Sequence, residues 1–236
     1  MIRVEHLTKR YKSLLALDDV SLHINKHECF ALLGLNGAGK STFINIICSL
    51  IEKDSGVVEV DGLNLDSNRQ DIKQIIGLSP QENALANNLT VRENLGFMAN
   101  LYGKTLENVD KMLKTFNLEV KADSLAKKLS GGQKRRLNLA MALISKPKVL
   151  ILDEPTLGLD VKSRKELWNI INDFKKDSTV LFTTHYLEEA EKYADRIAIM
   201  NKGKIALCGT KEEILAKSKS DSFEDAFLKY AGGEDE

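Results

Sequence analysis

The chain of 236 residues contains only three cysteines and three prolines. Cys29, Cys48 and Cys208 form no close pair, which argues against both a disulfide framework and a zinc-ligand spacing. We therefore expect a reducing cytosolic environment. Hydrophobic residues make up 43% of the chain and charged residues 29%, a composition that excludes a disordered or collagen-like protein and predicts a folded one.

The sequence also lacks long apolar runs and an excess of charge of one sign. Its start, from Met1 to Arg10, has no apolar core of a signal peptide, and no segment approaches the roughly 18 apolar residues that span a bilayer. Any membrane role is therefore expected to come through another subunit. Lys and Arg total 34, as do Asp and Glu, so no positive excess favours nucleic acid as a partner.

Short apolar runs alternate with longer amphipathic stretches, which predicts an α/β fold with a mainly parallel sheet. Apolar groups follow the helical period at 42–51 and 137–144. Strand signals are absent between 83 and 145, so we expect a helical subdomain there, within one domain spanning 1–236 that closes with a helical tail at 210–236. The expected strands are 29–33, 56–60, 75–78, 149–152, 179–183, 196–200 and 204–207, with a hairpin turn at 201–204.

A glycine-rich segment, Gly34-Leu35-Asn36-Gly37-Ala38-Gly39-Lys40-Ser41, fits the pattern G-x-x-x-x-G-K-[ST] between a predicted strand and helix. Its glycines let backbone N–H groups curl around phosphate oxygens, to which the helix N-terminus adds its positive dipole end. Lys40 is expected to reach the β and γ phosphates and Ser41 to offer a hydroxyl to Mg²⁺. The alternative is a glycine-rich turn that merely joins strand to helix. However, the chance that this pattern occurs at random in a chain of this length is on the order of one in a hundred. The segment therefore predicts nucleotide binding.

Two carboxylates, Asp153 and Glu154, follow the predicted strand at 149–152. Open α/β sheets bind ligands at this carboxyl edge. Asp153 is suited to hold Mg²⁺ through its hydration shell, and Glu154 could orient and deprotonate an attacking water. An acidic turn before Pro155 is the alternative, but two adjacent acids at the end of a buried strand repel each other, and a cation would offset that repulsion.

A second glycine cluster, Leu129-Ser130-Gly131-Gly132-Gln133, opens the predicted helix that includes 137–144. Ser130 can cap this helix beside bare glycine amides, which would make a second anion site. On these grounds alone, a capped helix start without a ligand is about as good an interpretation.

Six elements taken together resemble the ATPase subunit of an ABC transporter, and the resemblance covers nearly the whole chain. They occur in the family's order: the loop at 34–42, Gln81, the pentapeptide at 129–133, the pair Asp153-Glu154, the pair Leu159-Asp160, and His185. The resemblance implies an α/β fold with a P-loop NTPase (RecA-like) core, an N-terminal antiparallel β-subdomain and an inserted α-helical subdomain. It also implies a head-to-tail dimer that holds two ATP molecules between the phosphate loop of one subunit and the pentapeptide of the other.

The resemblance further implies a role for each matching residue. Tyr11 would stack on adenine, Gly34 through Thr42 would hold the phosphates, and Ser41 and Gln81 would coordinate Mg²⁺. Glu154 would polarise water, His185 would contact the γ-phosphate, and Asp160 would link the two sites. The pentapeptide, through Ser130 and Gly132, would bind the γ-phosphate of the opposite site. Read alone, Tyr11 fits an aromatic packed on a sheet, Gln81 an ordinary loop amide and His185 a hydrogen-bonded histidine at a strand end.

The segments 183–191, 194–197, 209–210 and 223–227 resemble the multidrug and drug-resistance exporter branch. This implies a separate polytopic permease subunit, a location at the cytoplasmic face of the cell membrane, and ATP hydrolysis coupled to transport. A homodimer with two working sites is compatible with an intact pentapeptide and an intact Glu154 on one chain. The alternatives are a soluble ABC ATPase that remodels a cytosolic complex, as in iron–sulfur assembly, and a small-molecule P-loop kinase, which gives no reason for the pentapeptide.

Overall fold

The computed structural model describes residues 1–232 and divides into two compact units. Unit 1 combines Met1–Lys73 with the part of the chain that follows Ser178, and unit 2 is Gln74–Ser178. The last four residues of the predicted tail at 210–236 lie outside the described residues. No helix among residues 1–232 is long and apolar enough to cross a membrane.

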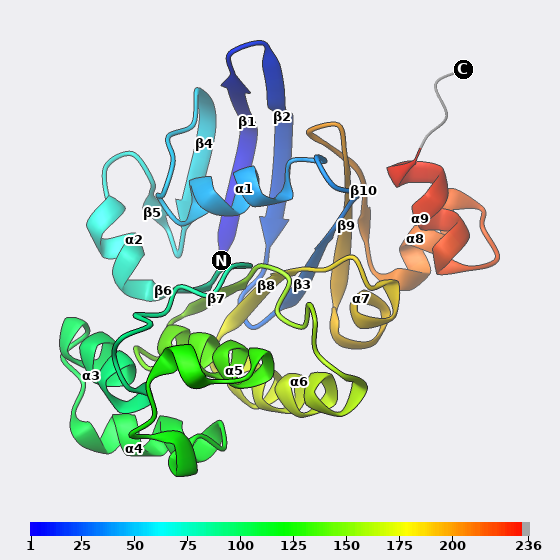
Figure 1. The fold of residues 1–236 in the computed structure, drawn as a ribbon. Helices are drawn as coiled ribbons and strands as arrows, with labels where there is room; N and C mark the ends of the chain where they lie inside the picture. Colours follow the sequence, from blue (N-terminus) through cyan, green and yellow to red (C-terminus); the bar gives the residue numbers. More distant parts are fainter. Residues whose placement is uncertain (233–236) are drawn as a thin grey trace. The chain divides into compact units, whose positions relative to one another are not determined.

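Unit 1 contains an antiparallel sheet of four strands in the order β2-β1-β4-β5. Side chains of β1 such as Ile2, Val4 and Leu7 are buried, and its register shifts where His6 takes a positive φ of 51°. Helix α1 lies across this sheet and packs on β2 (Figure 1). The bounds are β1 Ile2–Tyr11, β2 Leu14–Ile24, α1 Lys40–Ile47, β4 Ser55–Val60 and β5 Leu63–Asn64.

Unit 1 also contains strands in the order β10-β9-β3-β8. Strand β3 pairs in parallel with both β8 and β9, while β10 runs antiparallel to β9. Every residue of β3 and β8 is buried, as continuous apolar runs predict for central parallel strands. The bounds are β3 Cys29–Leu33, β8 Thr179–Thr183, β9 Arg196–Asn201 and β10 Lys204–Gly209.

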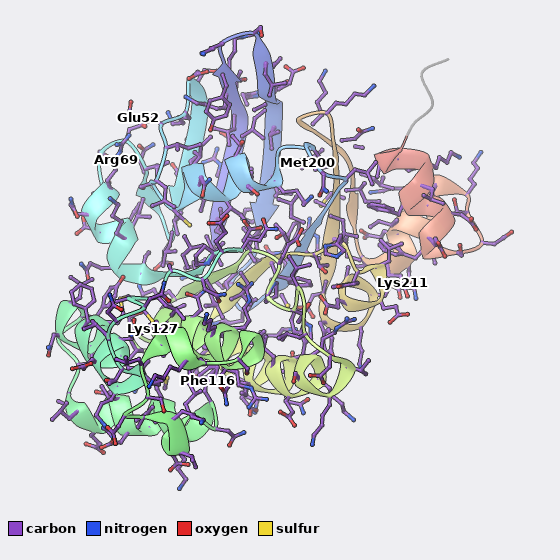
Figure 2. All side chains as sticks on the ribbon, in the orientation of Figure 1. Glu52, Arg69, Phe116, Lys127, Met200 and Lys211 are labelled. Carbon is purple, nitrogen blue, oxygen red and sulfur yellow. The ribbon has the colours of Figure 1, made fainter. Side chains whose placement is uncertain are left out.

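The remaining helices of unit 1 cover these strands and the edge of the antiparallel sheet. Helix α9 packs on β9 and α8, with Phe223 and Phe227 buried. Arg69 at the start of α2 pairs with Glu52 at 3.2 Å, and Figure 2 labels both residues. The bounds are α2 Arg69–Ile75, whose last two residues belong to unit 2, α7 Leu187–Tyr193, α8 Lys211–Ser218 and α9 Phe223–Ala231.

Unit 2 joins a parallel pair of strands, β6 and β7, to a group of helices. Helix α3 packs on α4 and α5, and α5 packs on β6. Phe116, labelled in Figure 2, follows α4 and is fully buried. The bounds are β6 Ile76–Ser79, α3 Val91–Leu101, α4 Leu106–Thr115, α5 Gly131–Leu143, β7 Val149–Leu152 and α6 Val161–Lys175, with 3-10 turns at Glu119–Lys121 and Ala126–Lys128.

The predicted strands at 29–33, 149–152 and 179–183 are confirmed, and the other four differ by one or two residues at their ends. The predicted turn at 201–204 is confirmed, because only Lys202 and Gly203 separate β9 from β10. The helix predicted at 42–51 was placed wrongly at both ends: α1 begins at Lys40 and ends at Ile47, since Ser49 takes a left-handed φ of 57°. Between 83 and 145 the structure has only helices, turns and one isolated bridge, Thr90 to Leu125.

Candidate functional site

The predicted phosphate loop connects β3 to α1 in unit 1. Gly37 and Gly39 take φ values of +83° and +107°, which glycine adopts without strain. Gly39 caps α1 without a side-chain oxygen, whereas Thr90 and Ser130 accept hydrogen bonds from the first turns of α3 and α5. The backbone N–H groups in the first turn of α1 therefore receive no hydrogen-bond acceptor from a capping side chain. They can donate to an acceptor on a ligand instead.

Two of the loop's glycines lie so close to other backbone atoms that a side chain would not fit. A Cβ at Gly34 would lie 2.5 Å from the Met200 carbonyl oxygen, and one at Gly39 would lie 2.6 Å from the Ala16 carbonyl oxygen. The loop is also tied to the turn between β9 and β10, because Gly203 N–H donates to the Ala38 carbonyl at 3.0 Å. The Gly203 hydrogen bond and the close contacts at Gly34 and Gly39 thus fix the loop against β2, β9 and the turn that follows β9.

Lys40 begins α1 and is only 7% exposed. Its ammonium donates to the carbonyl oxygens of Gly34 at 2.7 Å and Leu35 at 3.1 Å, so it lies over the loop. Ser41 is exposed, and Thr42 is half-buried. The structure thus brings together the predicted residues from Gly34 to Thr42 around one helix N-terminus.

Parallel pairing places His185 at the same sheet edge as the loop. Leu32 of β3 is opposite Thr183 of β8, so the chain leaves both strands side by side. His185 is exposed, and its ring centroid lies 4.2 Å from that of Tyr186. The preceding Thr184 is buried and its hydroxyl donates to the buried Glu189 carboxylate at 2.9 Å. Sequence reasoning did not predict this hydrogen bond between Thr184 and Glu189.

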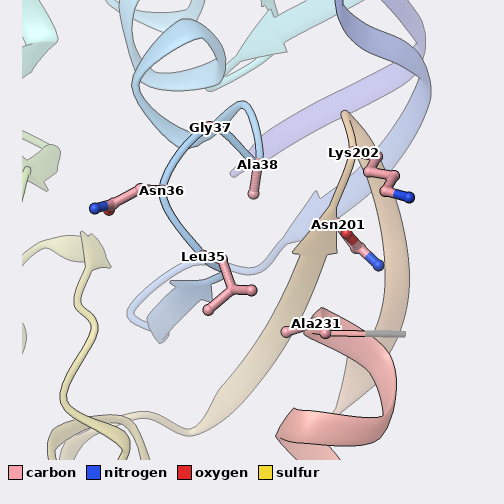
Figure 3. A pocket seen from close by; sticks show the side chains of 8 residues that line it. Leu35, Asn36, Gly37, Ala38, Asn201, Lys202 and Ala231 are labelled. Atoms are coloured by element: carbon pink, nitrogen blue, oxygen red, sulfur yellow. The ribbon is translucent and has the colours of Figure 1, made fainter. Parts of the chain in front are cut away.

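A pocket of about 310 Å³ opens beside the loop in unit 1. Figure 3 shows Leu35 and Ala38 on the side of the loop that faces Asn201 and Ala231. The lining residues are Leu35, Asn36, Gly37, Ala38, Asn201, Lys202, Ala231 and Gly232. The loop therefore borders a hollow as well as a helix N-terminus.

Tyr11 ends β1 and is 43% exposed. The Lys9 ammonium lies 5.5 Å from its ring centroid, and its strand partner is Leu14. An exposed ring at the end of a sheet is available for stacking. A ring that is 43% exposed and lies beside Lys9 fits both the stacking role and the alternative of an aromatic packed on a sheet.

In unit 2, parallel pairing also brings Gln81 and the acidic pair to one edge. Ser79 of β6 is opposite Leu152 of β7, so Gln81 and Asp153-Glu154 follow neighbouring strand ends. Asp153 and Glu154 are each 9% exposed. Glu154 has a positive φ of 47°, which is strained for a residue with a Cβ. Such strain is typical of functional positions and persists only where the surroundings hold it.

The Arg135 side chain, which sequence reasoning missed, contacts the residues that follow both of these strands. It is 5% exposed and donates to carbonyl oxygens of Gln81, Asp153 and Glu154, among others. Burial lowers its pKa to about 10, and the charges of Asp153 and Glu154 oppose that shift. The only sequence signal is its place two residues after the pentapeptide.

The predicted pentapeptide forms a capping box at the start of α5. Ser130 N–H donates to Gln133 Oε1 at 3.0 Å, and Gln133 N–H donates to Ser130 Oγ at 3.3 Å. A Cβ at Gly131 would meet nothing within 4 Å, and one at Gly132 would meet only Leu159 at 3.6 Å. The glycines are therefore not required by packing in this chain alone, which leaves room for a ligand or partner.

Asp160 caps α6 and is exposed. It accepts hydrogen bonds from Ser163 N–H at 2.9 Å and Ser163 Oγ at 2.8 Å. These bonds hold the pKa of Asp160 below its ordinary value. The local structure thus gives Asp160 a capping role in addition to the predicted role in linking two sites.

No cluster of three or more His, Cys, Asp or Glu side chains within residues 1–232 could hold a metal by itself. The predicted donors are instead one hydroxyl, one amide and one carboxylate, from Ser41, Gln81 and Asp153. Hard oxygen ligands of this kind suit Mg²⁺, which keeps several waters and binds phosphate oxygens as well. The residue types therefore fit the predicted ion.

Comparison with known sequences places residues 17–157 in a family described as ABC transporter. The chain is 42% identical over 217 residues to the phospholipid-transporting ATPase ABCA3 of Rattus norvegicus, of which it spans 13%. It is 38% identical over 227 residues to the linearmycin resistance ATP-binding protein LnrL of Bacillus subtilis (strain 168), covering 94% of this chain and 73% of LnrL.

Solved structures give the same assignment. An ATP-binding subunit of an ABC transporter matches with a TM-score of 0.90 and 30% identity, covering 98% of this chain and 99% of the other. The MJ0796 cassette, a dimer in a post-hydrolysis state bound to ADP and Pi, matches with a TM-score of 0.82 and 28% identity over 89% of this chain and 98% of MJ0796. These likenesses confirm the predicted α/β P-loop NTPase fold with its antiparallel sheet and helical part. The chain therefore belongs to the ABC transporter family and is an ATPase cassette of that family.

Proposed function

We propose that this chain is the ATP-hydrolysing subunit of an exporter and acts as a head-to-tail dimer against a separate polytopic membrane subunit. The observation that carries the proposal is the start of α1, where left-handed Gly37 and Gly39 and the buried Lys40 surround a helix N-terminus that has no side-chain cap. The name of LnrL, a resistance ATP-binding protein of which this chain spans 73%, supports the export direction.

In this proposal, the loop from Gly34 to Thr42 binds the phosphates of ATP through its backbone N–H groups and the Lys40 ammonium. The exposed ring of Tyr11 stacks on adenine. Ser41, Gln81 and Asp153 supply oxygen ligands to Mg²⁺, which offsets phosphate charge when bound. Binding is thus divided between a rigid phosphate cradle and separate metal donors.

Hydrolysis in this proposal is assigned to Glu154, His185 and Lys40. Glu154 accepts a proton from the attacking water, so its strained backbone must hold the carboxylate in one orientation. His185 contacts the γ-phosphate, and Lys40 stabilises charge on the transferred group. Positioning and charge stabilisation dominate such catalysis, so small displacements of these groups reduce turnover strongly.

The proposed dimer places the pentapeptide against the ATP of the other subunit. Ser130, Gly131, Gly132 and Gln133 form an anion-binding helix start, and the open space at Gly131 and Gly132 supports this use. Asp160 is assigned to contact between the two sites. The solved MJ0796 dimer supports the arrangement by its description as a dimeric cassette.

We assign the chain to the cytoplasmic face of the cell membrane, where it binds the permease rather than lipid. The test is to purify the tagged protein from detergent-solubilised membranes of its own cell and to identify co-purifying proteins by mass spectrometry. A parallel purification of the Glu154→Gln variant in the presence of ATP serves as the matched sample. Because this variant should bind ATP without hydrolysing it, the closed dimer and its complex with the permease should last longer.

A polytopic membrane protein in stoichiometric amount is the expected result. Recovery only from the soluble fraction, with cytosolic partners, would reject the transporter assignment in favour of a complex-remodelling ATPase. An ATPase assay without co-substrate separates both from a kinase, which requires an acceptor.

A further inference from the structure

The Arg135 guanidinium in unit 2 has an unusual set of partners. Its Nε donates to Pro155 O at 2.7 Å, and its Nη2 donates to Asp153 O and Glu154 O, both at 2.7 Å. Its Nη1 donates to Pro80 O at 2.6 Å and Gln81 O at 3.2 Å. These five bonds equal the five N–H donors that a guanidinium carries.

Only arginine can satisfy these partners. Burying a cation is costly unless it is hydrogen-bonded and near opposite charge. Arg135 is 5% exposed, and the charges of Asp153 and Glu154 favour its charged form. Lysine has three donors on one atom, so it would leave at least two of the five carbonyls without their partner.

The carbonyls come from the two segments that hold proposed catalytic and metal-binding residues. One segment is Pro80–Gln81 and the other is Asp153–Pro155, which includes the left-handed Glu154. Asn138, one turn further along α5, contacts the end of β6 and the start of the first segment, with Nδ2 at 3.4 Å from both Ser79 Oγ and Pro80 O. Arg135 is thus the residue of α5 that spans both segments.

We infer that Arg135 is a positioning residue for ATP hydrolysis, which fixes the backbones of Gln81 and Glu154 so that their side chains stay aligned with the attacking water and the metal. The inference rests on the proposed roles of Gln81 and Glu154. It assigns Arg135 no contact with ATP, because all five of its donors are already used within unit 2.

The test compares Arg135→Lys with Arg136→Lys in the full-length protein. Arg136 is the matched control, since it is the next residue of α5 but is half-buried and pairs with Glu166 at 2.8 Å. For Arg135→Lys we expect kcat to fall about 10- to 100-fold, because misplacing a catalytic group by about 1 Å has an effect of this size. ATP affinity, measured at equilibrium, should stay within about threefold of wild type, since the phosphate loop lies in unit 1.

A double-mutant comparison separates positioning from a merely structural role. If Arg135 acts through Glu154 as well as Gln81, then the loss of kcat in Arg135→Lys combined with Glu154→Gln should be smaller than the product of the two single losses. Losses that multiply, an unchanged kcat in Arg135→Lys, or a kcat loss equal to its loss of folded protein by circular dichroism would overturn the inference.

If Arg135→Lys does not fold, Arg135→Gln provides the measurement. Glutamine carries no charge to bury and keeps two of the five donors, so kcat should fall about 10- to 100-fold at unchanged ATP affinity, and an unchanged kcat would reject the inference. The proposed function fails separately, if wild type does not hydrolyse ATP or if Glu154→Gln hydrolyses it at the normal rate. Normal turnover in Arg135→Lys beside a slow Glu154→Gln would reject the positioning role alone.

Discussion

The Lys40 ammonium lies 2.7 Å from the carbonyl oxygen of Gly34, six residues earlier in the same loop. The Lys40 side chain therefore lies across the opening of the loop, and residues of this chain alone are enough to bury it. Because a buried cation beside glycine amides attracts anions, this geometry supports the proposed role of Lys40 in binding the phosphates of ATP.

Replacing Lys40 by alanine should weaken ATP binding by about 10- to 100-fold, the equivalent of losing one charged hydrogen bond. Equilibrium binding of labelled ATP measures this directly. Lys202→Ala is the control, because Lys202 lines the pocket beside the loop but is not among the predicted ligands. Equal losses in the two variants would show that general positive charge, and not the position of Lys40, binds ATP.

Glu154→Gln should leave ATP affinity nearly unchanged and slow turnover by about 10²- to 10⁴-fold, as expected for loss of a general base. The two side chains have similar size and the same left-handed backbone, so the fold should tolerate the change. Phosphate release under saturating ATP gives the rate, and Glu166→Gln on α6 controls for neutralising a carboxylate of unit 2. Near-normal hydrolysis by Glu154→Gln would remove Glu154 from the catalytic residues.

Gly39→Ala should destabilise the protein by about 1–3 kcal/mol, because alanine there must adopt a strained φ. The added Cβ would also lie 2.6 Å from the Ala16 carbonyl oxygen. Gly96→Ala is the opposite case, since Gly96 lies within α3 with open space around it, and we expect stabilisation of about 0.5–1 kcal/mol. Urea unfolding of both variants tests the pair, and a neutral Gly39→Ala would mean that the loop relaxes easily.

How far the sequence predicts the fold depends on the element. The strand at 29–33 and the loop after it were predicted correctly because a continuous apolar run followed by Gly34 to Ser41 is a local pattern. The strands β1 and β2 left no comparable pattern, since register shifts beside His6 and Lys9 interrupt their alternation. Only the family resemblance predicted an antiparallel part there.

The site shows the same division between local and long-range information. The spacing of Lys40 and Ser41 in the loop is readable from the sequence, as is the strand end before Asp153. Arg135 is not, because its partners are main-chain carbonyls of residues up to 55 positions away. Backbone carbonyls occur at every position, so no residue type marks them in a sequence.

Asp160→Asn should make the stability of the protein less sensitive to acid. Hydrogen bonds from Ser163 keep the folded-state pKa of Asp160 below its ordinary value of 3.8, so the ionised carboxylate adds stability above pH 3.8. That contribution is lost as the pH falls through the lower folded value. Asparagine also caps helices but does not titrate, so the stability advantage of wild type over the variant should shrink on acidification through this range.

Urea unfolding of wild type, Asp160→Asn and Asp160→Ala between pH 3 and pH 7 measures this difference, and taking differences between variants cancels the titration of other carboxylates. An advantage of wild type that stays constant with pH would contradict the assigned hydrogen bonds. The same variants separate the two roles of Asp160, because Asp160→Asn keeps the cap and loses the charge. If the charge serves contact between the two ATP sites, Asp160→Asn should reduce the cooperativity of hydrolysis while retaining the helix start that Asp160→Ala weakens.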